Sequence, residues 1–215
     1  MNKMVMALLL VSLLGLAGCD SAYYGVYEQF GVLKNDLLVD RVEDAVEAQE
    51  EAKEEFKSAF EQFEAVVGVP DSDLKSVYNK LSGAFEDAQA KAAEVDSRVA
   101  AVEDVSEDLF DEWAEEIEQI SNSSLQQKSK DQLRASKRRY ANLHKAMTRA
   151  QDRMEPVLTA FSDHVLFLKH NLNAQAIASL KGELAGIESD VGRLIADMES
   201  SIAQAQSFLK TMDAG

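Results

Sequence analysis

The single cysteine of the chain stands in a motif that supports covalent attachment of lipid. Leu16, Ala17 and Gly18 precede Cys19, and this order of Leu, two small residues and Cys is the lipobox of bacterial envelope proteins. Small residues fit the pocket of the signal peptidase, and the Cys19 thiol takes up a diacylglycerol. Cleavage before Cys19 then frees an amine for a further acyl chain. Two or three acyl chains anchor a protein firmly, whereas one binds only marginally. The sequence therefore predicts lipidation at Cys19.

The residues before Cys19 form a targeting segment. Met1–Lys3 gives a short positive start, and the run Met4–Leu14 is apolar throughout apart from Ser12. This run is too short to span a bilayer, which takes about 20 residues, but it suits the apolar centre of a signal peptide. We therefore expect residues 1–18 to be a signal peptide that is removed.

The rest of the chain, residues 19–215, is predicted to form one long-helical domain. Lipid on Cys19 would hold this domain to a bacterial membrane, facing the periplasm. Asp20 follows the cysteine and resembles the signal that retains such proteins in the inner membrane of enteric bacteria. We therefore expect the inner membrane rather than the outer membrane.

A second candidate for chemistry is a basic run in an acidic chain. Residues 40–118 hold 25 acidic and seven basic residues, whereas residues 119–155 hold nine basic and three acidic residues. Folding the chain back at residues 121–124 would set the acidic stretch along the basic one, and opposite charges would then favour one antiparallel register. The alternative is that the run contacts anionic lipid headgroups or other polyanions. The residues concerned are Lys128, Lys130, Arg134, Lys137, Arg138 and Arg139.

Catalytic and metal-binding patterns do not emerge from the remaining residues. His164 and His170 are six residues apart, which is not the spacing of three or four that puts two ligands on one helix face. None of the histidines, including His144, belongs to a Glu-x-x-His pair or a His-Glu-x-x-His zinc motif. A glycine-rich phosphate loop is also missing. We therefore expect no enzyme activity, no metal and no cofactor, and we interpret His164 and Trp113 as core residues.

Apolar residues recur at spacings of three and four over nearly all of the chain after residue 23, which is typical of amphipathic helices. In the first stretch the apolar positions include Val39, Val46, Phe60 and Val67, with Gln49 as a polar interruption. The breaks are short and polar, and long helices joined by short loops pack antiparallel. The sequence predicts an all-α fold, an elongated antiparallel bundle or coiled coil of about four helices, over residues 23–68, 71–120, 124–170 and 174–212.

The ends and interiors of the helices carry four further expectations. Ser123 and Gln126 have the spacing of a capping box that opens the third helix. Residues 170–173 contain neither Gly nor Pro, so a turn is favoured there but one continuous helix stays open. Pro156 is interpreted as a kink or as the first residue of a restarted helix. Three glycines within the last helical pattern are interpreted as sites of close helix packing; they are Gly182, Gly186 and Gly192.

Composition excludes several classes of protein. The chain has 215 residues, a net charge of −16, ten Gly and two Pro. So few turn-forming residues argue against a β-sandwich or barrel. The acidic total argues against nucleic acid as a partner, and one cysteine excludes an internal disulfide.

Three runs resemble a group of uncharacterised gammaproteobacterial lipoproteins that is classed as a domain of unknown function. These runs are residues 36–59, 109–117 and 165–184, and the resemblance extends from Cys19 to about Phe208. It implies an envelope lipoprotein with a helical domain and brings no catalytic or ligand residues. We expect a helical scaffold, spacer or adaptor for other envelope proteins. A carrier of a small ligand, lipid or metal between the helices is the alternative, and a homo-oligomer stays open.

Overall fold

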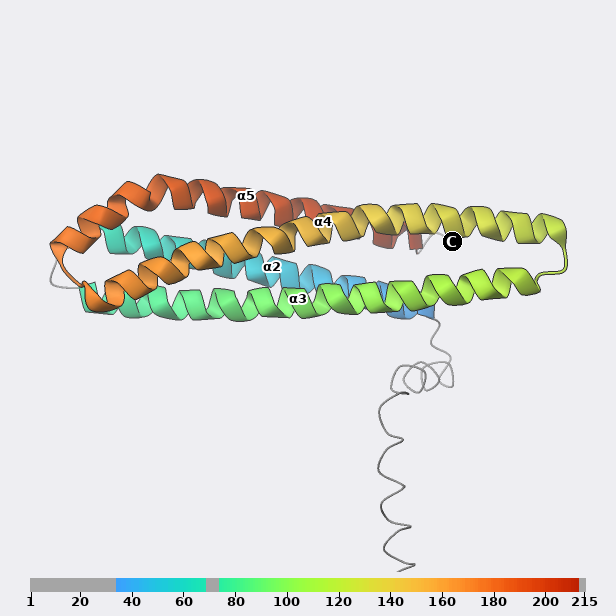
Figure 1. The fold of residues 1–215 in the computed structure, drawn as a ribbon, viewed down its shortest axis with the longest axis horizontal. Coiled ribbons are helices and arrows are strands. Elements are labelled where there is room, and N and C mark those ends of the chain that lie inside the picture. Colours follow the sequence, from blue (N-terminus) through green and yellow to red (C-terminus); the bar gives the residue numbers. More distant parts are fainter. Residues whose placement is uncertain (1–33, 69–73, 213–215) are drawn as a thin grey trace, which may run out of the picture. The chain divides into compact units, whose positions relative to one another are not determined.

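A computed structural model describes residues 34–68 and 74–212, and nearly all of these residues are helical (Figure 1). The helices are α2 (Lys34–Gly68), α3 (Leu74–Gln119), α4 (Ser123–His170) and α5 (Ala174–Met212). The described ranges contain no strand. The prediction of an all-α fold with about four long helices is therefore confirmed. The expected helix starts at residues 23 and 71 lie outside the described residues.

The chain divides into two compact units, residues 1–37 and 38–215. Only residues 34–37, at the start of α2, are described in the first unit. The second unit contains the rest of α2 and all of α3, α4 and α5. Among the described helices, none combines the length and the apolar character that crossing a membrane requires.

Neighbouring helices of the second unit run antiparallel, as ion pairs and hydrogen bonds between them show. Between α2 and α3, Asp44 pairs with Arg98 at 3.3 Å and Glu51 with Lys91 at 2.6 Å. Residue numbers therefore rise along one helix as they fall along the other. The same relation joins α3 to α4, and it is set by two contacts: Asp96 with Gln151 at 3.0 Å and Glu118 with Lys130 at 2.9 Å.

The remaining helix contacts complete the bundle. Arg153 of α4 donates from Nε to Asp197 of α5 at 2.5 Å. The Phe63 ring of α2 contacts two rings of α4, with centroid distances of 6.4 Å to Phe161 and 5.1 Å to His164. Helix α2 therefore packs against both α3 and α4.

The apolar interior follows the predicted stripes with one systematic difference in α2. The buried face of α2 combines large residues such as Phe56 with alanines such as Ala45, Ala52 and Ala59. The predicted stripe members Val39, Val46, Phe60 and Val67 are only partly buried. The interior positions of α2 are thus shared by alanines and large residues, and the four partly buried stripe members lie at the edges of the interface.

Asparagines cap both ends of α4 and the start of α5. The side-chain oxygen of Asn122 accepts from the backbone N–H groups of Ser124 and Leu125 at 3.0 and 3.1 Å, so Asn122 is the N-cap of α4. The predicted capping box at Ser123 was therefore one residue late. Gln126 instead donates from its side chain to the carbonyl of Ile117 at 3.1 Å, across the turn.

Residues 171–173 form a turn between α4 and α5, so the favoured prediction of a break there is confirmed. The Asn171 side chain donates to the Phe167 carbonyl at 2.9 Å, which satisfies one of the last carbonyls of α4. The Asn173 side chain accepts from the backbone N–H of Ala176 at 3.0 Å and caps α5. The side chains of these two asparagines thus satisfy backbone groups that a helix end leaves without a partner.

The structure decides two interpretations within the helices. Pro156 lies inside α4, which continues from Ser123 to His170, so no helix restarts there and a kink stays the prediction. The three glycines of α5 are exposed, and a Cβ atom added at any of them would meet nothing within 4 Å. The prediction that they allow close packing was wrong; they are Gly182, Gly186 and Gly192.

The α3–α4 hairpin continues beyond the ends of its neighbours in the second unit (Figure 1). The antiparallel contacts set Leu38 level with Asp104 of α3, and Met212, the last described residue of α5, level with Arg138 of α4. Residues 106–119 and 123–137 therefore form a segment in which α3 and α4 are the two described helices of the second unit. We call this segment, together with residues 138–140, the hairpin tip.

Candidate functional site

The predicted lipidation site lies outside the described residues. Cys19 and Asp20 both belong to residues 1–33. Lipidation therefore stays a prediction from sequence, and the structure offers one other region in which charged and aromatic side chains gather. That region is the hairpin tip.

The basic residues of α4 lie along the tip, but among the ion pairs of the described residues only one joins them to an acid of α3. That pair joins Lys130 Nζ to Glu118 Oε1 at 2.9 Å. Arg134 pairs within α4 with Asp131, and Arg139 donates to Ser136 at 3.0 Å. The expected zipper of acidic and basic side chains across the hairpin is therefore limited to one contact.

Three basic side chains remain at the surface of the tip. Lys137 lies over the Phe110 ring, with its Nζ 5.6 Å from the centroid. Lys128 and Arg138 are exposed and form no ion pair or hydrogen bond with the described residues. The opposite helix carries no basic residue from Asp104 to Gln119. The tip is thus acidic along α3 and basic along α4.

An aromatic cluster holds the two helices of the tip together. Phe110, Ile117 and Leu133 are buried, and Trp113 and Tyr140 pack partly buried against them. The rings of Phe110 and Tyr140 meet edge to face, with centroids 5.6 Å apart. These residues form the local core that keeps the hairpin paired beyond the four-helix region.

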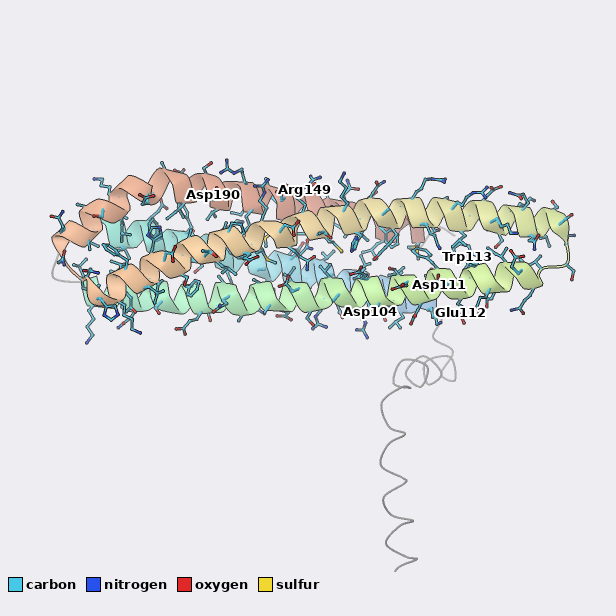
Figure 2. All side chains as sticks on the ribbon, viewed as in Figure 1. Asp104, Asp111, Glu112, Trp113, Arg149 and Asp190 are labelled. Carbon is cyan, nitrogen blue, oxygen red and sulfur yellow. The ribbon has the colours of Figure 1, made fainter. Side chains whose placement is uncertain are left out.

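Trp113 packs against this cluster with its ring and also forms a hydrogen bond to α4. Its indole Nε1 donates to the Ser129 hydroxyl at 3.0 Å. In Figure 2, Trp113 lies on the side of α3 that faces α4, whereas Asp104 and Glu112 project from the edge facing away. The predicted core position of Trp113 is confirmed in part, because its side chain keeps partial exposure.

Tyr140 and His144 extend the cluster towards the four-helix region. Their rings stack with centroids 5.7 Å apart, and His144 lies 3.8 Å from a Glu103 oxygen. Burial raises the pKa of Tyr140, an effect that the nearby Ser106 hydroxyl opposes. A tyrosine with a raised pKa stays protonated at neutral pH, so it supplies a hydroxyl and no charge.

His164 occupies a partly buried position beside Phe63, in agreement with the interpretation as a core residue. Burial lowers the pKa of His164, while Glu183 and Asp163 act in the opposite direction. Within residues 34–68 and 74–212, no group of three or more His, Cys, Asp or Glu side chains is arranged to hold a metal ion.

Two polar side chains are buried without partners in the bundle interior. Gln49 of α2 is 1% exposed and Ser201 of α5 is 0% exposed. The amide oxygen and nitrogen of Gln49 have no hydrogen-bond partner among the described residues, and the hydroxyl of Ser201 has none either. The contacts of Phe63 with α4 and of Arg153 with α5 place the two residues at about the same level. Sequence reasoning noticed Gln49 only as an interruption and missed Ser201, because a single serine in a helix carries no signal of burial.

An open groove of about 670 Å³ lies between α3 and α4. Asp96, Asp152, Glu155 and Asp163 are among its lining residues, together with the apolar Leu158. Gln151 and Asp96 bridge it with a hydrogen bond of 3.0 Å. An open, acidic groove of this kind does not enclose a ligand as small-molecule sites do.

A family model described as "Protein of unknown function (DUF2959)" matches residues 23–212, nearly the whole chain. Neither a curated protein nor a solved structure matches.

Proposed function

This chain belongs to the DUF2959 family, and we propose that it is a non-enzymatic lipoprotein of the bacterial envelope. In this proposal Cys19 carries the lipid, and the helical domain faces the periplasm as a scaffold, spacer or adaptor for other proteins. Asp20 favours retention in the inner membrane.

The packing of the second unit supports the proposed scaffold role. Large side chains such as Phe56, Phe161 and Met198 are fully buried between the helices, which supports a packed interior rather than the cavity that a carrier needs. Long packed helices resist bending and present their outer faces at fixed spacing. A charged hairpin tip at one end of such a unit is suited to contact with other proteins.

Crosslinking in intact cells tests the scaffold role. A photo-crosslinking amino acid at exposed Arg138 in the tip is compared with one at exposed Lys181 of α5 as the matched control. We expect discrete protein adducts from position 138 and few from position 181. Equal, diffuse labelling from both positions would contradict a scaffold that presents its tip.

The buried polar atoms of Gln49 and Ser201 favour the alternative, a carrier. Unpaired polar atoms inside a protein are rare and are satisfied in most cases by water or a ligand. Native mass spectrometry of the chain purified in mild detergent distinguishes the two roles. A scaffold gives the mass of the acylated chain, whereas a carrier gives an added mass that is lost in a Gln49→Leu variant.

A further inference from the structure

The open groove between α3 and α4, which we call the acidic groove, has apolar side chains at its base. Its lining includes the buried Ala92 and Met154 and the partly buried Phe85 and Leu158. Ala93 also lines it. An alanine side chain ends at Cβ, so the alanines of α3 leave room beside the longer side chains of α4. The groove therefore offers apolar surface that an inserted side chain can cover.

The described parts of α2 and α5 lie on other sides of the two helices that form the acidic groove. On α3, Lys91 pairs with Glu51 of α2, whereas Asp96 accepts from Gln151 of α4. On α4, Arg153 donates to α5. All lining residues of the groove belong to α3 and α4. The groove is level with Glu51, in the middle of α2, and so away from the ends of the described ranges.

The charge of the acidic groove has one sign. Its described lining contains four carboxylates and no basic side chain; the acids are Asp96, Asp152, Glu155 and Asp163. Asp152 and Asp163 are about 16 Å apart along α4, at 1.5 Å per residue. No three His, Cys, Asp or Glu side chains of the described residues are arranged to hold a metal ion. Carboxylates spread in this way match a row of positive side chains better than a single ion.

The backbone of α4 adds a further acceptor beside the acidic groove. Pro156 lies inside α4, and proline has no backbone N–H. The carbonyl of Asp152, four residues earlier, therefore lacks the donor that a helix normally provides. Lys and Arg side chains carry several N–H donors each. The surroundings of Asp152 thus favour an occupant with cationic donors.

The chain itself places a lysine in a neighbouring groove of similar chemistry. Glu103 lies seven residues, or two turns, after Asp96 and so on the same side of α3. Glu103, Phe110 and Lys137 line an open groove of about 450 Å³ there. Lys137 Nζ lies 5.6 Å from the centroid of the Phe110 ring, a favourable cation–π geometry. The acidic groove has the ring of Phe85 and the carboxylates, but no lysine of its own.

We propose that the acidic groove binds a cationic amphipathic helix of a partner protein. Apolar side chains on one face of that helix cover Phe85 and Leu158, as in other helix-in-groove complexes. Its Lys or Arg side chains meet Asp152 and Glu155. The lining of α3 extends from Phe85 to Asp96, so the bound part of the helix has about three turns.

Charge and apolar surface together separate this partner from the alternatives. Anionic lipid headgroups and nucleic acid carry the same sign of charge as the groove and are repelled. A short polyamine would neutralise the carboxylates but leave Phe85 and Leu158 exposed to water. The inference rests on the proposed scaffold role, because it names a class of partner protein. It does not involve Cys19, so loss of the lipid and loss of this binding are measured separately.

Fluorescence anisotropy with labelled synthetic peptides tests the proposal. The full chain is purified in nonionic detergent, and the probe is a helical peptide of about 14 residues with Leu on one face and Lys on the other. We expect binding that weakens about tenfold or more at high salt, because exposed charge pairs are screened. A matched peptide with Glu in place of Lys is expected not to bind. One with Ser in place of Leu is expected to bind about tenfold more weakly, because it covers no apolar surface.

Two charge variants of the chain show where the Leu–Lys peptide binds. Asp152→Lys with Glu155→Lys reverses two charges in the groove. Glu47→Lys with Glu50→Lys makes the same change at the same spacing on exposed positions of α2. We expect the groove variant to raise the dissociation constant about tenfold or more, and the α2 variant to raise it less than about threefold through net charge alone.

The apolar part of the acidic groove is tested by Leu158→Ser, which leaves the charge unchanged. We expect the dissociation constant of the Leu–Lys peptide to rise about fivefold, since the lost contact is apolar. Circular dichroism and thermal melts establish that this variant and both charge variants are folded. The two charge variants change exposed positions only, so their comparison holds even if Leu158→Ser lowers stability.

Four results would overturn the proposal. The first is that the Leu–Lys peptide does not bind at low salt. The second is that the groove and α2 charge variants weaken binding equally, because binding would then follow net charge. The third is equal affinity for the Ser peptide, which would assign the groove to a small polycation such as spermine. The fourth is self-association of the chain that Asp152→Lys with Glu155→Lys abolishes, which would make a second copy the occupant.

Discussion

The indole Nε1 of Trp113 on α3 donates to the hydroxyl of Ser129 on α4, at 3.0 Å, across the hairpin tip. This bond joins two helices where no other described helix supports them. We expect Ser129→Ala to lower the free energy of unfolding by about 1 kcal/mol, as for the loss of one partly buried hydrogen bond. Urea denaturation followed by circular dichroism measures the change.

The control for this bond is Ser200→Ala, which removes an exposed serine hydroxyl from α5. We expect its stability to stay within about 0.5 kcal/mol of the unchanged chain. A Ser129→Ala chain as stable as this control would show that the indole bond contributes nothing to holding the tip.

Gln49 is expected to reduce the stability of the bundle. Its amide is 1% exposed, and its oxygen and nitrogen lack partners among the described residues. Gln49→Met keeps the length of the side chain and removes the buried polar atoms, so we expect a gain of about 1–2 kcal/mol in urea denaturation. A loss of similar size would mean that the amide has a bound partner, which would support the carrier.

The exposed glycines of α5 offer a second route to a more stable chain. A Cβ at Gly186 meets nothing within 4 Å, and Ala fits a helix better than Gly because less backbone entropy is lost on folding. We expect Gly186→Ala to stabilise the fold by about 0.5–1 kcal/mol, and Gly182→Ala to add a similar amount. Thermal melts test this, and destabilisation by either change would show close packing at that glycine.

Stability is expected to depend on pH through His164. Burial lowers the pKa of His164 in the folded chain, so the unfolded chain binds the proton more readily. The folded state is therefore favoured above the ordinary histidine pKa of about 6.5 and loses this advantage as pH falls through that value towards the lowered pKa. We expect His164→Phe to flatten the stability profile in this window, measured by urea denaturation at several pH values.

The facing carboxylates make a control for this profile necessary. Glu183 and Asp163 act on His164 against the effect of burial. A His144→Phe variant removes a histidine of similar partial exposure elsewhere in α4. If both variants changed the profile equally, the effect would not belong to the environment of His164.

Sequence patterning predicted the helices well because their apolar periodicity persists over tens of residues. The ends were harder to locate, since several polar residues near a turn can cap a helix. Asn122, Ser123 and Ser124 are adjacent, and only the backbone geometry shows that the Asn122 side chain reaches the free N–H groups of α4. Periodicity also weights large residues, so it missed that alanines such as Ala45 and Ala52 are fully buried on the inner face of α2.

The candidate site was predictable in charge but not in contacts. Composition alone revealed the acidic and basic stretches on either side of residues 121–124. It could not show that Lys130 and Glu118 pair across the turn while Lys128 lies free of described partners, because long side chains choose among several neighbours. Nor could it show where α5 ends relative to α4, which leaves Leu125 exposed.

Mass spectrometry of the mature N-terminus gives the decisive measurement for the proposed lipoprotein. Cells are fed an alkyne analogue of palmitate, and labelling and membrane fractionation are compared for the unchanged chain, Cys19→Ala and Asp20→Asn. We expect the unchanged chain to begin at an acylated Cys19 in the inner membrane, and Cys19→Ala to lose both label and membrane retention. Asp20→Asn is expected to keep the label and move towards the outer membrane. A Cys19→Ala chain that is still labelled and still in the membrane would contradict the lipid anchor on which the proposed function depends.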